Sequence, residues 1–167
     1  PWSPPYHYLE QVFLPMISKM GVEVELELDH WGWYPEGGGT IFAHIEPAKK
    51  LRGIKLEDRG ELKGIRGISA ISNLKLSIAE RQRTQALKCL SKADYEADIS
   101  IINASVIGQG TVIFLLAFFE RSLAAFTSLG ERGKRAEQVA EEACRELLDF
   151  LRSKAAIDKH LADQLIP

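Results

Sequence analysis

The residues best suited to chemistry stand together near the end of the chain, in the run His160-Leu161-Ala162-Asp163-Gln164. At helical spacing His160, Asp163 and Gln164 share one face, whereas Leu161 belongs to a separate apolar stripe. A ring can stack on a base, a carboxylate can accept hydrogen bonds from ribose hydroxyls, and an amide can contact phosphate, water or metal. The pattern fits nucleotide recognition, and it also fits an ordinary polar helix face.

Three glycine-rich segments are further candidates for binding phosphate. Gly37-Gly38-Gly39 leads into a strand rather than a helix, which favours a tight hairpin with positive φ over a phosphate loop. Gly108-Gln109-Gly110 lies between two strand patterns and predicts a turn or bulge, with ligand contact as the alternative. Residues 130–135 precede a long helix and could bind an anion or form a connector with solvated charges.

The remaining histidines and the two cysteines show no metal-binding pattern. His7, His30 and His44 lack the spacing of ligand sets, so structural or solvated roles are favoured. Cys89 and Cys144 both lie in helical patterns and are interpreted as small core hydrophobes. Unpaired thiols of this kind predict a reducing, cytoplasmic location.

The composition excludes several classes of protein. The chain is 46% hydrophobic and 26% charged, which is typical of a globular protein rather than a disordered or fibrous one. No apolar run approaches the ~20 residues that cross a bilayer, and nothing resembles a secretory signal, so no membrane partner is expected. A net charge of −2 disfavours broad duplex binding but permits contact with a single nucleic-acid end.

Apolar periodicity predicts a helix and a hairpin in the first part of the chain. The helix follows Pro5, Pro15 should kink or split it, and Gly21 should end it. Alternating apolar and acidic residues predict strands near residues 22–28 and 41–45, which form the hairpin.

After a boundary at residues 47–52, the pattern predicts an α+β block with its own core. Ser77-Ile78-Ala79-Glu80 has the form of a capping box, and Asp158 is a predicted cap of a last helix. The block contains four expected strands and two expected helices. The strands lie near 62–69, 99–104, 112–119 and 123–127, and the helices near 77–90 and 136–151.

Several segments in a fixed order carry a resemblance to a known family. They are Ser3-Pro4-Pro5 before Phe13-Leu14-Pro15, Gly32-Trp33-Tyr34-Pro35-Glu36-Gly37-Gly38-Gly39, Leu129-Gly130-Glu131-Arg132-Gly133-Lys134-Arg135-Ala136-Glu137, and Asp158-Lys159-His160-Leu161-Ala162-Asp163-Gln164-Leu165. In combination they resemble the RNA 3′-terminal phosphate cyclase family over essentially the whole chain, most weakly across residues 74–107. The chain opens without methionine and closes within an apolar pattern, so we expect a central fragment of such a protein.

The resemblance implies an α+β protein in two parts. The large domain would consist of repeated units, each a four-stranded sheet with two helices, and a smaller α+β domain of the same composition would be inserted into it. Residues 1–50 and 156–167 would belong to the large domain, and residues 51–155 would form the insert.

The resemblance also implies a three-step reaction. A histidine attacks the α-phosphate of ATP, AMP then passes to the RNA 3′-phosphate, and the neighbouring 2′-hydroxyl closes a 2′,3′-cyclic phosphate and expels AMP. Adenylation supplies a leaving group and the vicinal hydroxyl is already positioned, so the sequence of steps is physically sound. ATP is then the cosubstrate, with a divalent metal, Mg, and RNA 3′-phosphate ends are the partner.

Carried over residue by residue, the resemblance assigns a nucleotide pocket. Pro4 corresponds to a proline near the adenine, and His160 takes a place often held by tyrosine. Asp163 and Gln164 match polar nucleotide contacts. Their backbone neighbours in the pocket would be Leu161 and Ala162.

Two departures from the family pattern affect the expected chemistry. His7 stands where an aspartate is usual, which puts one polar contact of the pocket in doubt. The nucleophilic histidine is expected beyond Pro167, so no catalytic residue is assigned in this chain, and the chain alone should be inactive. The sequence makes no prediction of oligomeric state or of a particular RNA.

Two other interpretations stay open. The first is a non-catalytic protein of the same fold that acts in ribosome assembly and lacks the nucleophile. The second is an RNA- or protein-binding module in which the insert alone is functional. Its basic residues lie on the helix expected at 77–90, where a solvated face is the simpler interpretation: Arg81, Arg83, Lys88 and Lys92.

Overall fold

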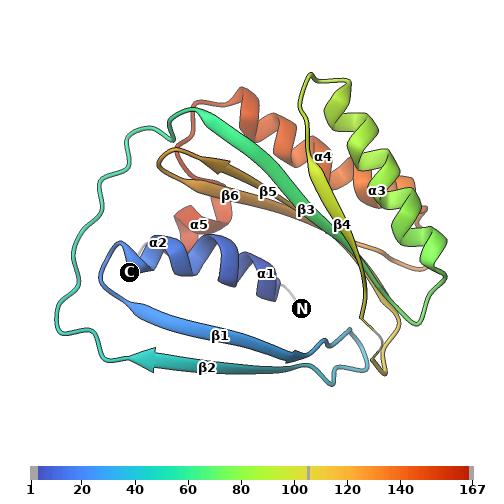
Figure 1. Ribbon diagram of the computed structural model, residues 1–167, viewed down its shortest axis with the longest axis horizontal. Helices are drawn as coiled ribbons and strands as arrows, with labels where there is room; N and C mark the ends of the chain where they lie inside the picture. The colour runs from blue at the N-terminus through green and yellow to red at the C-terminus, as the bar shows by residue number, and fades with distance from the viewer. Residues whose placement is uncertain (1–3, 105, 166–167) are drawn as a thin grey trace.

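A computed structural model of the chain describes residues 4–104 and 106–165 and arranges them in layers (Figure 1). Two long helices cover one side of a four-stranded sheet, an N-terminal helix lies on its other side, and a two-stranded ribbon lies beyond that helix. This arrangement confirms the predicted α+β class. Ser3 and Pro167, which entered the sequence analysis, lie outside the described residues.

The N-terminal helix consists of α1 (Tyr6–Tyr8), the π-helical segment η1 (Leu9–Phe13) and α2 (Leu14–Ser18). At the end of η1 the backbone N–H of Leu14 donates to the carbonyl of Leu9, five residues earlier. The wider turn falls just before Pro15, which has no N–H to donate. The helix continues through Pro15, so of the predicted kink or split, the split does not occur. Gly21 has φ +90° and ends the helix as predicted.

The ribbon is the predicted hairpin, made by β1 (Glu23–His30) and β2 (Thr40–Glu46). Gly37 and Gly38 adopt φ values of 72° and 79°, so the glycines serve the turn, as the hairpin interpretation requires. Strand β2 is exposed along almost its whole length, and apolar side chains lie along it: Ile41, Phe42 and Ile45.

The larger sheet has the strand order β4-β3-β5-β6. Strand β3 runs parallel to β4, to which α3 connects it, and every other pair is antiparallel. All four predicted strands and both predicted helices are confirmed. Their bounds are β3 (Leu62–Ser72), α3 (Leu76–Ser91), β4 (Asp98–Asn103), β5 (Gly110–Phe119), β6 (Leu123–Leu129) and α4 (Ala136–Arg152), and α5 (Lys159–Gln164) follows.

One face of this sheet is covered by α3 and α4 (Figure 1). Among the described residues, the buried members of the core between these helices and the sheet all lie within residues 65–150. Cys144 is 1% exposed in this core and Cys89 packs against it, so both cysteines are the core residues that the sequence predicted. The apolar residues of α4 recur about every 3.6 residues, so they lie on one side of the helix and pack against the sheet.

The other face is covered by segments from the two ends of the chain. Tyr8, Val12 and Met16 of the N-terminal helix form a second buried cluster with residues of β5 and β6. Leu161 of α5 joins the same cluster and is fully buried. The sheet is therefore held between its own helices on one side and the flanking segments on the other.

The predicted capping box at Ser77 is wrong. Helix α3 begins at Leu76, after Lys75, and no side chain caps its first turn. Instead the backbone N–H of Ile78 donates to the carbonyl of Lys75 at 2.9 Å. The chain enters the helix two residues earlier than the sequence motif suggested, which leaves Ser77 exposed within the first turn.

Arg59 joins the start of the four-stranded block to its end. Its guanidinium carbon lies 4.9 Å from the ring centre of Phe119 and 4.8 Å from that of Phe150. A cation also complements the negative end of the α4 dipole. Its N–H groups donate to four carbonyls at and beyond the end of α4, at 2.7–3.2 Å: Phe150, Leu151, Ser153 and Ala155.

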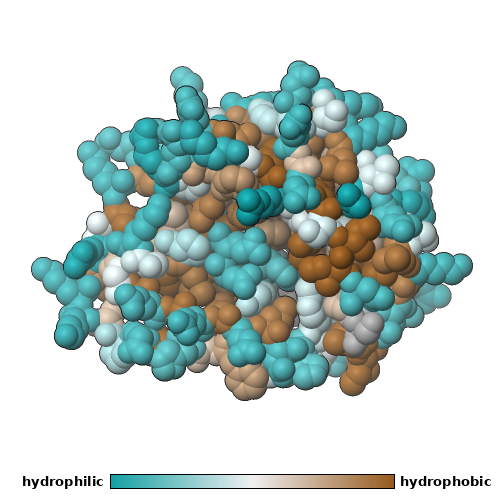
Figure 2. Space-filling view, viewed as in Figure 1, coloured by the Kyte–Doolittle hydropathy of each residue, from teal (hydrophilic) through white to brown (hydrophobic). Residues whose placement is uncertain are grey.

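Apolar side chains reach the surface at the loop between β4 and β5. In Figure 2, brown side chains gather at the lower right of the view, where Figure 1 draws this loop. Ile107, in the same loop, is 86% exposed. Most of the remaining visible face is teal, which agrees with the charged composition.

Arg59→Ala should lower the free energy of unfolding by about 2 kcal/mol, because it removes charge-assisted bonds to four carbonyls. Urea titration of the chain measures the effect. Arg152→Ala is the matched control, because this arginine forms only an exposed pair with Asp149 and should change stability by less than about 0.5 kcal/mol. Equal losses in the two variants would contradict the role given to Arg59.

Residues 51–155 alone should unfold in one cooperative transition, because one complete core lies within them. The urea midpoint should be lower than that of the whole chain, since removing the N-terminal helix and α5 uncovers the second face of the sheet. Far-UV circular dichroism of both chains measures the midpoints. A gradual loss of signal from residues 51–155 would contradict independent folding.

Candidate functional site

The orientation of α5 is set by Asp158, which caps this helix as predicted. One carboxylate oxygen, Oδ1, accepts the backbone N–H of His160 at 2.9 Å and that of Leu161 at 3.1 Å. The same oxygen accepts the hydroxyl of Tyr8 at 2.7 Å. Asp158 is 1% exposed, so this hydrogen-bonded junction is closed to solvent.

The predicted division of α5 into a polar and an apolar face is present. Leu161 is fully buried, Ala162 is half-buried, and His160 and Asp163 are exposed. Gln164 departs from the prediction, because it is half-buried and its Oε1 atom is enclosed without a hydrogen-bond partner. A ring and a carboxylate therefore face solvent beside a buried acceptor that lacks a donor.

Pro4 lies directly before the helix that packs against α5. It is half-buried, and the carbonyl of its neighbour Pro5 accepts the backbone N–H of Tyr8 at 2.9 Å. The ring of Tyr8 in turn meets the ring of His160 edge to face, with centroids 6.1 Å apart at 83°. The N-terminal helix and α5 are thus adjacent, although about 150 residues separate Tyr8 from Asp158 and His160 in sequence.

Tyr8 is the residue of this region that the sequence analysis missed. Burial and the hydrogen bond to Asp158 raise the pKa of Tyr8, so its hydroxyl remains a donor. The burial of Tyr8 could have been predicted from its spacing with Val12 and Met16, because the three residues are four positions apart. The helix, including the wider η1 turn, places them on one buried face. The partner of the hydroxyl, 150 residues later, left no local signal.

His7 packs in an aromatic cluster rather than making a polar contact. Its ring centre lies 4.9 Å from that of Trp31 and 5.8 Å from that of Phe114, and Tyr6 lies at its edge. Burial lowers the pKa of His7, while the Glu10 carboxylate opposes this shift. His7 therefore acts as a neutral packing ring at neutral pH.

The glycines at positions 108 and 110 make room for Trp33. A Cβ atom at Gly110 would lie 2.0 Å from the Trp33 ring, and one at Gly108 would lie 2.9 Å from the Trp33 Cβ. The Trp33 backbone also forms a bridge with Gly37. Close packing against the indole accounts for the missing side chains at Gly108 and Gly110, which supports the turn interpretation of that segment.

In the basic segment at residues 130–135, the lysine is engaged within the protein. Lys134 is paired with Glu142 and also donates to the carbonyl of Leu129 at 3.2 Å. The side-chain carbonyl of Gln138 accepts a hydrogen bond from the backbone N–H of Arg135 at 3.0 Å, and this bond caps the first turn of α4. The one half-buried lysine of the segment is thus engaged within the protein, in agreement with the connector interpretation.

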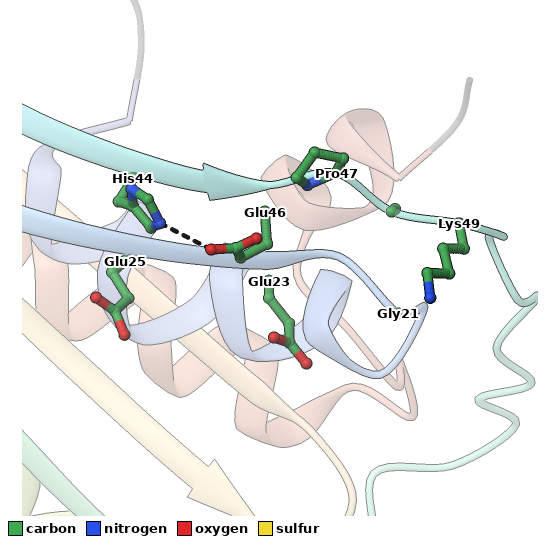
Figure 3. Close-up of a pocket in the computed structure, with 8 residues that line it drawn as sticks. Gly21, Glu23, Glu25, His44, Glu46, Pro47 and Lys49 are labelled. Carbon is green, nitrogen blue, oxygen red and sulfur yellow. Dashed lines mark hydrogen bonds and ion pairs between the residues drawn. The ribbon is translucent and has the colours of Figure 1, made fainter.

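An open hollow of about 600 Å³ beside the β1–β2 ribbon is lined by three glutamates, a histidine and Lys49 together with small residues and a proline (Figure 3). Glu23, Glu25 and Glu46 line it, and His44 Nε2 lies 2.9 Å from a carboxylate oxygen of Glu46. Carboxylates would repel the phosphates of a nucleotide, so the hollow is unsuited to one. Within residues 4–104 and 106–165, no group of three or more His, Cys, Asp or Glu side chains could hold a metal ion.

No helix in the described part of the chain is long and apolar enough to cross a bilayer.

Comparison with known proteins identifies the family. Residues 57–152 match the family described as RNA 3′-terminal phosphate cyclase (RTC), insert domain. Proteins named RNA 3′-terminal phosphate cyclase are similar over 99% of the chain: 44% identical in Methanothermobacter thermautotrophicus, 42% in Methylococcus capsulatus and 39% in Gloeothece citriformis.

The chain spans about half the length of these relatives, covering 49%, 46% and 47% of them respectively. The match of residues 57–152 includes the four-stranded sheet with α3 and α4, and the similarity to relatives extends through α5. The chain therefore belongs to the RNA 3′-terminal phosphate cyclase family.

Proposed function

We propose that this chain is the central part of an ATP-dependent RNA 3′-phosphate cyclase. In this proposal a histidine beyond Pro167 takes AMP from ATP, AMP passes to the RNA 3′-phosphate, and the adjacent 2′-hydroxyl closes the 2′,3′-cyclic phosphate as AMP leaves. The chain supplies part of the nucleotide pocket and not the nucleophile, and alone it is inactive. The family membership and the exposed polar face of α5 support the proposal.

The α5 face is the observation that carries the nucleotide assignment. The His160 ring is exposed for stacking on adenine, and the Asp163 carboxylate is exposed to accept ribose hydroxyls. Gln164 is half-buried beside these two side chains, and in this proposal it completes the polar set of the helix. Leu161 and Ala162 place these three side chains, and Pro4 precedes the helix that supports them.

Residues 4–104 and 106–165 hold no ligand set for the magnesium ion of the proposal. The described residues include no cluster of carboxylate, imidazole or thiolate groups able to hold one. Magnesium is commonly bound by one or two carboxylates together with substrate phosphates. We therefore assign no residue of this chain to the metal and derive no step from it.

We also propose the domain division into residues 1–50 and 156–167 in the large domain and residues 51–155 as the insert. The match to the insert domain at residues 57–152 supports it. The apolar side chains exposed along β2 support it as well, because uncovered apolar edge strands of this kind pack against further protein.

Asp163→Ala in the intact parent protein should weaken ATP binding by about ten- to a hundredfold, the range of one hydrogen bond to a charged group. Calorimetric titration with ATP measures the affinity. Asp149→Ala is the matched control, since Asp149 is an exposed carboxylate on α4 that pairs with the exposed Arg152. Unchanged affinity in the Asp163 variant would contradict the pocket assignment.

Incubation of the parent protein with ATP labelled in its α-phosphate should give an acid-labile AMP adduct on a histidine beyond Pro167. This chain alone should take up no label, because none of its histidines is assigned as nucleophile. Peptide mapping locates the adduct. Label on His160 would make the assignment of the nucleophile wrong, and no label on the parent protein would favour the non-catalytic role in ribosome assembly.

A further inference from the structure

We propose that Tyr8 and Asp158 form a positioning pair that holds the nucleotide-binding face of α5 in place. The proposal rests on the proposed function, since it concerns the same face. Neither residue is exposed to a ligand, because both are 1% exposed. Tyr8 and Asp158 can therefore affect nucleotide binding only by positioning the residues of α5 that face solvent.

The first argument is the concentration of hydrogen bonds on one atom. Oδ1 of Asp158 accepts the Tyr8 hydroxyl and two backbone N–H groups of α5. Because the two N–H groups belong to His160 and Leu161, the carboxylate fixes the backbone at the start of the binding face. Tyr8 fixes the carboxylate in turn, with a bond of 2.7 Å inside the protein.

The second argument is the length of α5. The helix has six residues, and helices of fewer than about 12 residues are marginal in water without external support. The support here comes from the Asp158 cap and from burial of Leu161 against the N-terminal helix and the sheet. Weakening the cap should therefore let the binding face move before the rest of the fold is affected.

The third argument is the direct contact between Tyr8 and the proposed stacking residue. The Tyr8 ring meets the His160 ring edge to face, with 6.1 Å between centroids. Such pairs are attractive beyond the area they bury, so Tyr8 restricts the ring that would stack on adenine. One tyrosine thus orients both the backbone and the side chain of the same site.

The two carboxylate oxygens of Asp158 differ in their hydrogen bonds, and this difference indicates that a single acceptor oxygen is sufficient for the positioning. Oδ2 is buried and has no hydrogen-bond partner, whereas Oδ1 makes every bond that the structure records for this group. An asparagine could keep the working oxygen and place its amide where Oδ2 lies. Asp158→Asn should therefore preserve the positioning, and Asp158→Ala should remove it.

The test measures ATP binding and steady-state kinetics on the intact parent protein. Tyr8→Phe and Asp158→Ala should each weaken ATP affinity about fivefold or more, the size of one or two lost hydrogen bonds. Because the variants lose only ground-state positioning of the nucleotide, the KM for ATP should rise while kcat at saturating ATP stays within about twofold. Asp158→Asn should restore an affinity close to that of the unmodified protein.

Tyr6→Phe is the matched control. It removes a phenol hydroxyl from the same helix, one that donates to Glu10 at 2.8 Å and to the carbonyl of Leu26 at 3.1 Å, away from α5. Its ATP affinity should be unchanged even if its thermal stability falls. A Tyr6 variant weakened as much as the Tyr8 variant would overturn the proposal, because the effect would then be general destabilisation.

Unchanged ATP affinity in Tyr8→Phe would also overturn the proposal, whatever its melting temperature. That result leaves the proposed function intact, since the unmodified protein still binds ATP in the same experiment. Failure of the unmodified parent protein to bind ATP has a different meaning, because it removes the proposed function itself. The two failures are therefore distinguished within one set of titrations.

Discussion

Burial of both faces of β5 is the constraint on which the rest of the structure depends. Residues 111–117 of this strand are all buried, so the sheet needs an apolar layer on each side. Helices α3 and α4 supply one layer from the same block of sequence. The other layer has to come from outside the block, and the N-terminal helix and Leu161 supply it.

The placement of the candidate site follows from this second layer. Burial of a leucine side chain contributes roughly 1.5–3 kcal/mol, which is enough to hold a short helix against the sheet. Once Leu161 is buried, helical geometry turns His160 and Asp163 to solvent. The binding face is thus a consequence of packing, and the hydrogen bond between Tyr8 and Asp158 sets its angle where the apolar layer ends.

Local sequence patterns predicted most elements well because these elements are buried on one side, as the α4 stripe and the alternation in β1 show. They failed where a backbone detail or a distant partner decides the outcome. The π-helical turn before Pro15 and the uncapped start of α3 depend on backbone hydrogen bonds that several residue types allow. The Tyr8–Asp158 bond and the inward turn of Gln164 depend on packing between the chain ends, which no local period records.

Weak long-range electrostatics make the geometry of α5 decisive for any nucleotide bound here. A net charge of −2 gives this chain no general attraction for phosphate, and the acidic ribbon of β1 and β2 repels it. The half-buried Lys134, which could have compensated, is paired with Glu142. Affinity supplied by this chain must then come from stacking and directed hydrogen bonds. Both are lost with small displacements. A short helix that carries such contacts needs a rigid anchor, and a buried tyrosine–carboxylate bond at its first turn provides one.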